Sequence, residues 1–267
     1  MKQVNTVKTY LIKKENEILL IEKACRIVAD TLSLIEKTIK PGITTLELDT
    51  IAEDYIRSKN AEPAFKGYGG PDNPFPFTLC VSINEEVVHG LPKNLALKEG
   101  DIVSVDCGAQ LNGYFGDSAI TVAVGEIDEE KKKLMKITEE SLFQGIKQAI
   151  SGNKVYDISR AVQAHCESNG FSLTRELVGH GIGKRLHEEP AIPNFVPTLL
   201  QRNHFPNLKL LKGMALAIEP MVHAGKHQVK TASDGWTVYT ADLKPAAHFE
   251  HTVIVDDKHP LILTLRD

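Results

Sequence analysis

Residues 102–124, IVSVDCGAQLNGYFGDSAITVAV, contain the pattern that decides the fold. Two apolar, strand-like runs flank Asn112-Gly113, a dipeptide that favours the tight turn of a β-hairpin. Each run carries one acid, Asp106 or Asp117, although acids are depleted in strands and are rarely buried alone. The hairpin places these acids within a pair or two of facing each other. The sequence therefore predicts a carboxylate pair that can hold one metal ion, or two ions that share a ligand.

A weak internal repeat places further acids in equivalent strands. Each half of the chain carries a His-Gly motif, then a strand with a carboxylate six residues after a glycine, then a later strand with a second acid. The matched features of the two halves are residues 87–91 and 178–182, Gly100 and Gly213, Asp106 and Glu219, and Asp117 and Glu250. Because the matches recur in the same order, the sequence predicts two duplicated halves about a pseudo-twofold axis.

The remaining elements follow from apolar periodicity and from Gly, Pro and Asn breakers. Helices are expected at residues 18–39, 45–60, 129–150 and 155–169, strands at 77–83, 102–107, 114–124, 249–255 and 261–265, and a loop at 67–76. No linker or low-complexity tract divides these elements. We therefore expect a single α+β domain over residues 18–267, preceded by a polar extension, residues 1–17, that becomes helical near its end.

Composition excludes several classes of protein. The 267 residues include 31 Lys and Arg against 35 Asp and Glu, a net charge of −4, which predicts no specific nucleic-acid binding. No run approaches the ~18 apolar residues of a membrane-spanning helix, and the first residues lack the apolar core of a secretory signal. The four cysteines, Cys25, Cys80, Cys107 and Cys166, form no C-x-x-C pair. These features predict a cytoplasmic protein with reduced thiols and no membrane contact.

Four acids gathered at one centre cannot all stay ionised out of water without cations. His180, between two glycines, adds a nitrogen donor, and such a mixed ligand set favours Mn²⁺, Fe²⁺, Co²⁺ or Zn²⁺. The alternative for each acid is a solvated strand end or an ion pair with a basic residue. His89 and His187 lie near the centre if the repeat is real, and are otherwise core histidines. Six further histidines are expected to be surface or packing residues: His204, His223, His227, His248, His251 and His259.

An ordered set of motifs spans both halves of the chain. It consists of NEEVVHGLP at residues 84–92, Asp106, GDS at 116–118, GHGIG at 179–183, HEEP at 187–190, IEPM at 218–221 and FEHT at 249–252. From about Ile18 to the C-terminus, this set resembles the type I methionine aminopeptidases. The resemblance implies the pita-bread (creatinase/aminopeptidase) fold, in which two pseudo-twofold related halves share a central antiparallel sheet backed by helices. Only 31 residues separate His187 from Glu219, which favours type I over the insertion-bearing type II.

The resemblance also implies a site and an activity. The metal ligands carried over by motif are Asp106, Asp117, His180, Glu219 and Glu250, with Asp117 and Glu250 bridging two divalent ions (Fe²⁺, Mn²⁺, Co²⁺ or Zn²⁺). The catalytic residues are Glu219 as proton shuttle, His89 beside the scissile nitrogen and His187 at the carbonyl oxygen, and Tyr68, Phe75, Cys80 and Trp236 line the methionine pocket. The implied enzyme is a monomer that removes the N-terminal methionine of nascent proteins when the second residue is small, with transient ribosome association.

Three departures from the family pattern surround the expected substrate mouth. The Tyr68–Cys80 loop is about four residues longer than usual, Leu186 replaces the usual Phe, and the Pro190–Leu211 loop is long. They bear on side-chain selectivity rather than on metal binding. Two alternatives stay open. One is an X-Pro dipeptidase or aminopeptidase P-like peptidase, which usually has a large N-terminal domain where about 17 residues precede the first helix here. The other is a metal-free binding protein on the same fold.

Overall fold

The described part of the N-terminal segment, residues 11–17, packs against the rest of the chain. The computed structural model describes residues 11–266. The first helix, α1 (Glu15–Thr38), begins three residues before its predicted start. Leu11 is buried, and the largely buried Lys13 pairs with Glu188 far along the chain. Residues 11–17 of the predicted extension therefore pack against the rest of the described chain, and residues 1–10 lie outside the described residues.

All four predicted helices and all five predicted strands are present, with ends that shift by at most four residues. The other helices are α2 (Thr45–Ser58), α3 (Glu129–Ile146) and α4 (Val155–Ser168). The strands are β1 (Glu62–Pro63), β2 (Leu79–Ile83), β3 (Glu86–Val88), β4 (Ile102–Leu111), β5 (Tyr114–Ala123), β6 (Ser172–Leu173), β7 (Gly179–Gly181), β8 (Glu188–Ile192), β9 (Ala215–Ile218), β10 (Met221–His223), β11 (Val229–Thr231), β12 (Val238–Thr240), β13 (Ala246–His248), β14 (Glu250–Ile254) and β15 (Leu261–Ile262). β9 is the strand that the repeat predicts after Gly213, and the strands that were not predicted are two to five residues long, too short to establish a two-residue period.

Nine strands form one central sheet, in the order β1-β4-β5-β14-β9-β7-β8, with β2 paired to β4 and β15 to β14. All of these pairings are antiparallel. The predicted hairpin is confirmed, because Leu111 pairs with Tyr114 and both turn residues, Asn112 and Gly113, have positive φ. Two three-stranded sheets, β13-β10-β6 and β11-β12-β3, complete the fold.

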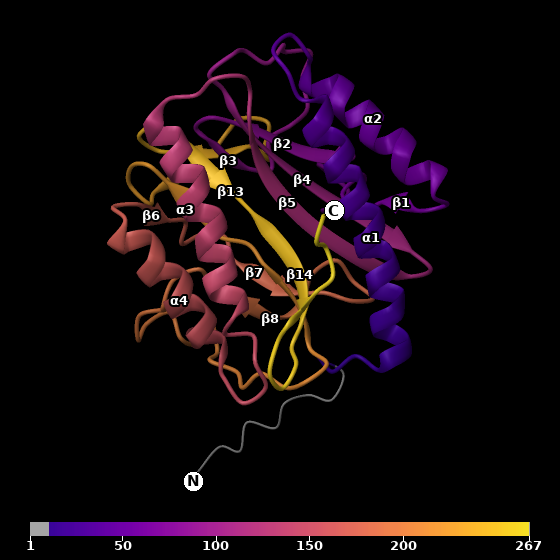
Figure 1. The fold of residues 1–267 in the computed structure, drawn as a ribbon, viewed down its shortest axis with the longest axis vertical. Coiled ribbons are helices and arrows are strands. Elements are labelled where there is room, and N and C mark those ends of the chain that lie inside the picture. The colour runs from indigo at the N-terminus through magenta and orange to yellow at the C-terminus, as the bar shows by residue number, and fades with distance from the viewer. Residues whose placement is uncertain (1–10, 267) are drawn as a thin grey trace.

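The helices cover one face of the central sheet as two pairs (Figure 1), α1 with α2 and α3 with α4. In α2 the cap is reciprocal: the Glu47 amide donates to Thr44 Oγ1 (3.1 Å) and the Thr44 amide donates to a Glu47 carboxylate oxygen (2.8 Å). α1 packs so closely on β5 that a Cβ at Gly116 would lie 2.5 Å from the backbone nitrogen of Cys25. The predicted α+β organisation is therefore confirmed.

The described helices also bear on membrane insertion. Within residues 11–266, none has both the length and the apolar character that crossing a membrane requires.

Candidate metal centre and pocket

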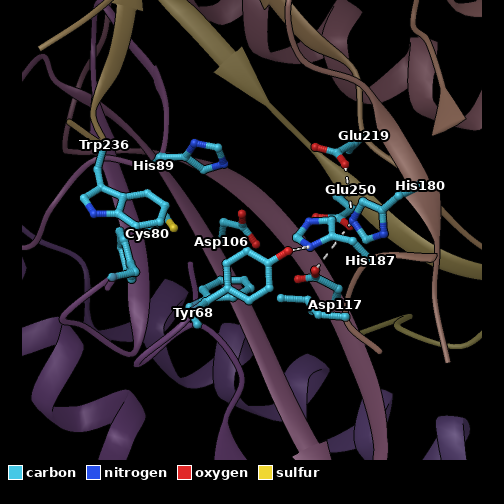
Figure 2. A pocket seen from close by; sticks show the side chains of 13 residues that line it. Tyr68, Cys80, His89, Asp106, Asp117, His180, His187, Glu219, Trp236 and Glu250 are labelled. Atoms are coloured by element: carbon cyan, nitrogen blue, oxygen red, sulfur yellow. Dashed lines mark hydrogen bonds and ion pairs between the residues drawn. The ribbon is translucent and has the colours of Figure 1, made fainter. Parts of the chain in front are cut away.

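Five consecutive strands of the central sheet bring acidic or imidazole side chains to one point (Figure 2). In sheet order these are Asp106 on β4, Asp117 on β5, Glu250 on β14, Glu219 just after β9, and His180 on β7. The register explains the convergence, because Ala119 of β5 pairs with both Asp106 and Glu250. Asp117 pairs with Gly108, two residues from Asp106, so these side chains project from the same face of the sheet.

The converging atoms lie at distances that suit shared cations. His180 Nε2 lies 3.5 Å from Glu219 Oε1 and 3.9 Å from Asp117 Oδ2. Ligand atoms of Asp117, His180 and Glu250 lie within 4.8 Å of one another, and so do those of Glu219, His248 and Glu250. The two groups share Glu250, so one carboxylate belongs to both candidate sets of metal ligands.

The buried acids of the cluster would be stabilised by nearby positive charge. Burial raises the pKa of Asp106 to about 7 and that of Glu219 to about 8. Burial, reinforced by neighbouring acids, also raises the pKa of Asp117 and of Glu250 well above the ordinary values. One oxygen each of Asp106, Asp117 and Glu250 is buried without any hydrogen-bond partner. Divalent cations would supply both the missing partners and the missing charge, so the residues fit a metal centre.

His180 is held in the form that binds a metal. Its Nδ1 lies 3.0 Å from the carbonyl oxygen of Gly181, and because a carbonyl oxygen only accepts, Nδ1 carries the proton. The lone pair of Nε2 is then free, and this atom faces Glu219 and Asp117. Burial lowers the pKa of His180 to about 3, so the ring is neutral. A backbone acceptor on the second nitrogen is a common way to orient a metal-binding histidine.

A cavity of about 130 Å³ adjoins the cluster, and every site residue named from the sequence lines it. Its lining is Phe65, Tyr68, Phe75, Cys80, His89, Asp106, Asp117, His180, Leu186, His187, Glu219, Trp236 and Glu250. One end is polar, and the other is apolar, with the Phe75 and Trp236 rings packed edge-on 5.2 Å apart. Burial raises the pKa of the Cys80 thiol well above its ordinary value, so it adds to the apolar end as a neutral group.

Two further histidines lie between the polar and apolar ends of the cavity. His89 follows β3 with a positive φ of 58°, and its ring lies edge-on to Trp236, 6.4 Å away. His187 lies beside His180, with ring centroids 4.2 Å apart, and its Nδ1 lies 2.6 Å from the hydroxyl of Tyr68. Loss of water around the rings lowers the pKa of His89 to about 4 and lowers that of His187, so both are neutral.

Two residues near the centre were not predicted from the sequence as site residues. Phe65 lines the cavity beside the predicted aromatic residues. His248 was expected to be a surface or packing residue, but its Nε2 lies 3.5 Å from Glu219 Oε2 in the donor cluster. A signal for His248 existed, because it precedes Glu250 by two residues and alternate residues of an extended chain point to the same side. Phe65 lies outside any periodic segment, and no sequence signal marks it.

Comparisons with known proteins agree with this geometry. The profile of metallopeptidase family M24 matches residues 20–257. A methionine aminopeptidase of Clostridium acetobutylicum is 52% identical over 256 residues, which cover 96% of this chain and 98% of that protein. The crystal structure of a methionine aminopeptidase from Thermotoga maritima has a TM-score of 0.89 and 44% identity, covering 96% of this chain and 99% of that one. A prolidase from Pyrococcus furiosus shares the fold, with a TM-score of 0.76, 23% identity and coverage of 96% and 66%.

The fold, the buried donor cluster and these matches define a metallopeptidase of family M24 that binds divalent metal. Within that family, the chain belongs to the methionine aminopeptidases. The predicted pita-bread fold and hydrolase class are therefore confirmed. The alternative of a metal-free binding protein on the same fold does not agree with this family membership or with the intact donor cluster.

Proposed function

We propose that this chain removes the N-terminal methionine from peptides and nascent proteins whose second residue is small. The observation that carries the proposal is one cavity in which a cluster of four acids and His180 adjoins an apolar end. The acids supply a place for cations, and the apolar end, bounded by Phe75 and Trp236, is suited to one unbranched, uncharged side chain. This arrangement supports metal chemistry next to a pocket for the methionine side chain.

We propose that two divalent ions occupy the cluster, chosen from Fe²⁺, Mn²⁺, Co²⁺ and Zn²⁺. The ligands would be Asp106, Asp117, His180, Glu219 and Glu250, with Asp117 and Glu250 shared between the ions. Nitrogen beside carboxylate oxygen favours these metals over Mg²⁺ and Ca²⁺, which prefer oxygen alone. When bound, such ions activate water for attack on the peptide carbonyl at neutral pH.

The protein's own groups would move protons and bind the developing charge. Glu219 has one oxygen facing His180 and a second facing away from it, so it can hold an ion and still pass a proton to the departing amine. His187, neutral and at the edge of the cluster, would donate from its ring to the carbonyl oxygen as negative charge develops there. His89, beside Trp236, would donate to the scissile amide region.

Tyr68, Phe75, Cys80 and Trp236 would hold the methionine side chain, with Phe65 and Leu186 completing the wall. Leu186 is smaller than the Phe usual in the family. We therefore propose that this wall, together with the longer loops near it, sets a side-chain tolerance of its own.

We further propose that the enzyme acts in the cytoplasm on chains leaving the ribosome, as a monomer whose catalytic domain is the whole described chain. The four cysteines are free and buried, as reduced thiols in a cytoplasmic protein are. Ribosome association and the monomeric state stay predictions.

The test is elemental analysis of protein purified without added metal, paired with an assay on Met-Ala-Ser and on a Gly-Pro peptide. We expect bound transition metal, release of methionine, and loss of turnover on chelation that returns when Mn²⁺ or Co²⁺ is added. Faster release of the proline-linked residue would replace the proposal with an X-Pro peptidase. Turnover that survives complete metal removal would overturn it.

A further inference from the structure

His248 carries the same structural signature as the proposed metal ligands. Its side chain is 1% exposed, and its Nε2 has no hydrogen-bond partner. Seven buried side-chain polar atoms lack a partner within residues 11–266, and four belong to this cluster, on Asp106, Asp117, Glu250 and His248. An unmet nitrogen in a dry site is costly, so a partner must form when the centre is complete.

The backbone of His248 is fixed by the centre of the main sheet. Its carbonyl accepts a hydrogen bond from Thr121 Oγ1 (2.8 Å), and its amide donates to the same oxygen (2.9 Å). Since the single hydroxyl proton of Thr121 goes to that carbonyl, Ser104 Oγ, 2.9 Å away, donates in turn to Thr121. β4 and β5, which carry Asp106 and Asp117, therefore also set the position of His248.

Glu219 lies between two imidazoles. Its Oε1 is 3.5 Å from His180 Nε2, and its Oε2 is 3.5 Å from His248 Nε2. His180 presents a lone pair, because its proton is on Nδ1. Glu219 Oε1 and His180 can therefore bind the same cation. Oε2, on the other side of the carboxylate, needs either a hydrogen-bond donor or an ion of its own.

We propose that His248 is a positioning residue that donates its Nε2–H to Glu219 Oε2, which turns Oε1 toward the metal and fixes the carboxylate that moves the proton. This inference rests on the proposed role of Glu219 as a ligand. The 3.5 Å separation closes to a hydrogen bond with a small side-chain movement, since catalytic hydrogen bonds are often long before the site is filled. Groups that orient a metal ligand in this way typically contribute 10- to 100-fold to metal affinity or activity.

The competing role for His248 is that of a further metal ligand. The two roles require opposite tautomers, because a ligand needs a bare Nε2 whereas a donor needs Nε2–H. They also respond differently to an amide side chain. Glutamine places an N–H near the position of His Nε2, while asparagine carries the same amide one methylene shorter and cannot reach Glu219.

The experiment compares His248→Gln with His248→Asn for Co²⁺ affinity, by competition with a fluorescent chelator, for the visible spectrum of the Co²⁺ protein, and for kcat and KM on Met-Ala-Ser. We expect Asn to weaken Co²⁺ binding and lower kcat by roughly 10- to 100-fold, with KM nearly unchanged. We expect Gln to stay within about threefold of the wild type in both, with the Co²⁺ spectrum preserved.

His223→Asn is the matched control, since His223 is equally buried but bonds to Thr174 and to the Lys226 carbonyl away from the centre. It should lower stability without changing Co²⁺ affinity. Wild-type behaviour of His248→Asn would overturn the inference, and so would a Gln variant as impaired as Asn with an altered Co²⁺ spectrum, which would identify a ligand. If the wild type itself neither binds Co²⁺ nor cleaves Met-Ala-Ser, it is the proposed function that fails.

Discussion

Two buried acids on opposite sides of β4 differ in how their oxygens are satisfied. Asp49 of α2 is 5% exposed, and its Oδ1 accepts hydrogen bonds from the amides of Thr78 (2.9 Å) and Leu79 (2.8 Å). Asp117 of β5 is 3% exposed, but its Oδ1 has no partner and its neighbours are other acids. Burial alone therefore does not mark a functional acid. An unmet oxygen among like charges does.

Glu188, next to His187 in the chain, resembles Asp49 in that both of its oxygens have partners. One of its oxygens pairs with Lys13, and the other accepts from the amide of Arg185 (3.1 Å). This pair ties the segment before α1 to the loop that carries His187. A fully satisfied acid here holds the fold in place, whereas the unsatisfied acids of the cluster are the proposed metal ligands.

The largest expected effect comes from changing an unsatisfied acid. Asp117→Asn removes a charge that the proposed ions share, so we expect turnover of Met-Ala-Ser to fall by more than about 100-fold, beyond what loss of a merely orienting residue costs. Bound metal, measured by elemental analysis, should fall as well. The thermal midpoint of the metal-free protein should not fall, because the variant removes a buried charge that has no counter-charge. If Asp117→Asn keeps full metal content and turnover, the acids with an unpartnered oxygen do not differ in role from the satisfied acids such as Asp49.

The satisfied acid should show the reverse pattern. Asp49→Ala leaves two buried backbone amides without an acceptor, so we expect the free energy of unfolding to fall by about 1–3 kcal/mol. Turnover per folded molecule should stay within about twofold. Asp54→Ala, at an exposed position of the same helix, is the control and should change stability by less than about 0.5 kcal/mol. Urea denaturation measures both. Metal loss in the Asp49 variant would contradict its structural role.

The pH dependence of stability should differ between the metal-free and the metal-loaded protein, because metal changes the protonation of the cluster acids. Burial raises the pKa of Asp106 to about 7 and that of Glu219 to about 8, so the folded chain keeps protons that the unfolded chain has released. The contribution of these acids to the stability of the metal-free protein is therefore fully present below the ordinary carboxyl pKa and lost as pH rises through 7 and 8. Buried histidines such as His180, whose pKa is lowered to about 3, oppose this trend below pH ~6.5, where their protonation favours the unfolded chain, but they do not oppose it between pH 7 and 8.

The measurement is the thermal midpoint at about pH 7 and about pH 8, with a chelator or with saturating Mn²⁺. We expect the chelated protein to lose several degrees and the Mn²⁺ protein to lose much less. An equal change in thermal midpoint between the two pH values, with chelator and with Mn²⁺, would show that the acids do not bind a cation.

The two groups of acids also differ in how far the sequence predicts them. Asp106 and Asp117 were predictable because a two-residue period and an Asn-Gly turn fix the register, and the repeat extends that reasoning to Glu219 and Glu250. His180 follows from its glycine context. Pairings over long sequence separations leave no local period, so nothing marked Lys13 as the partner of Glu188. His248 was missed because its motif lacks a counterpart in the first half, although its spacing from Glu250 was visible.

The smallest expected effect concerns the hydrogen bond between Tyr68 and His187. The Tyr68 hydroxyl lies 2.6 Å from His187 Nδ1, and a phenol donates more readily than it accepts, so the ring proton belongs on Nε2. That tautomer gives His187 a donor for the carbonyl oxygen. Tyr68→Phe keeps the aromatic wall but frees the tautomer, so we expect kcat to fall by about 2- to 12-fold, equivalent to about 0.5–1.5 kcal/mol, with KM unchanged.

Tyr114→Phe is the control for this last prediction, because its hydroxyl donates to Glu17 (3.0 Å) outside the pocket. It should leave kcat unchanged. The ¹⁵N shifts of His187 provide a readout independent of rate, since Nε2 should be protonated in the wild type and mixed in Tyr68→Phe. A larger KM with the same kcat would instead make Tyr68 part of the methionine wall alone, and His187 would then owe its orientation to His180, whose ring lies 4.2 Å away.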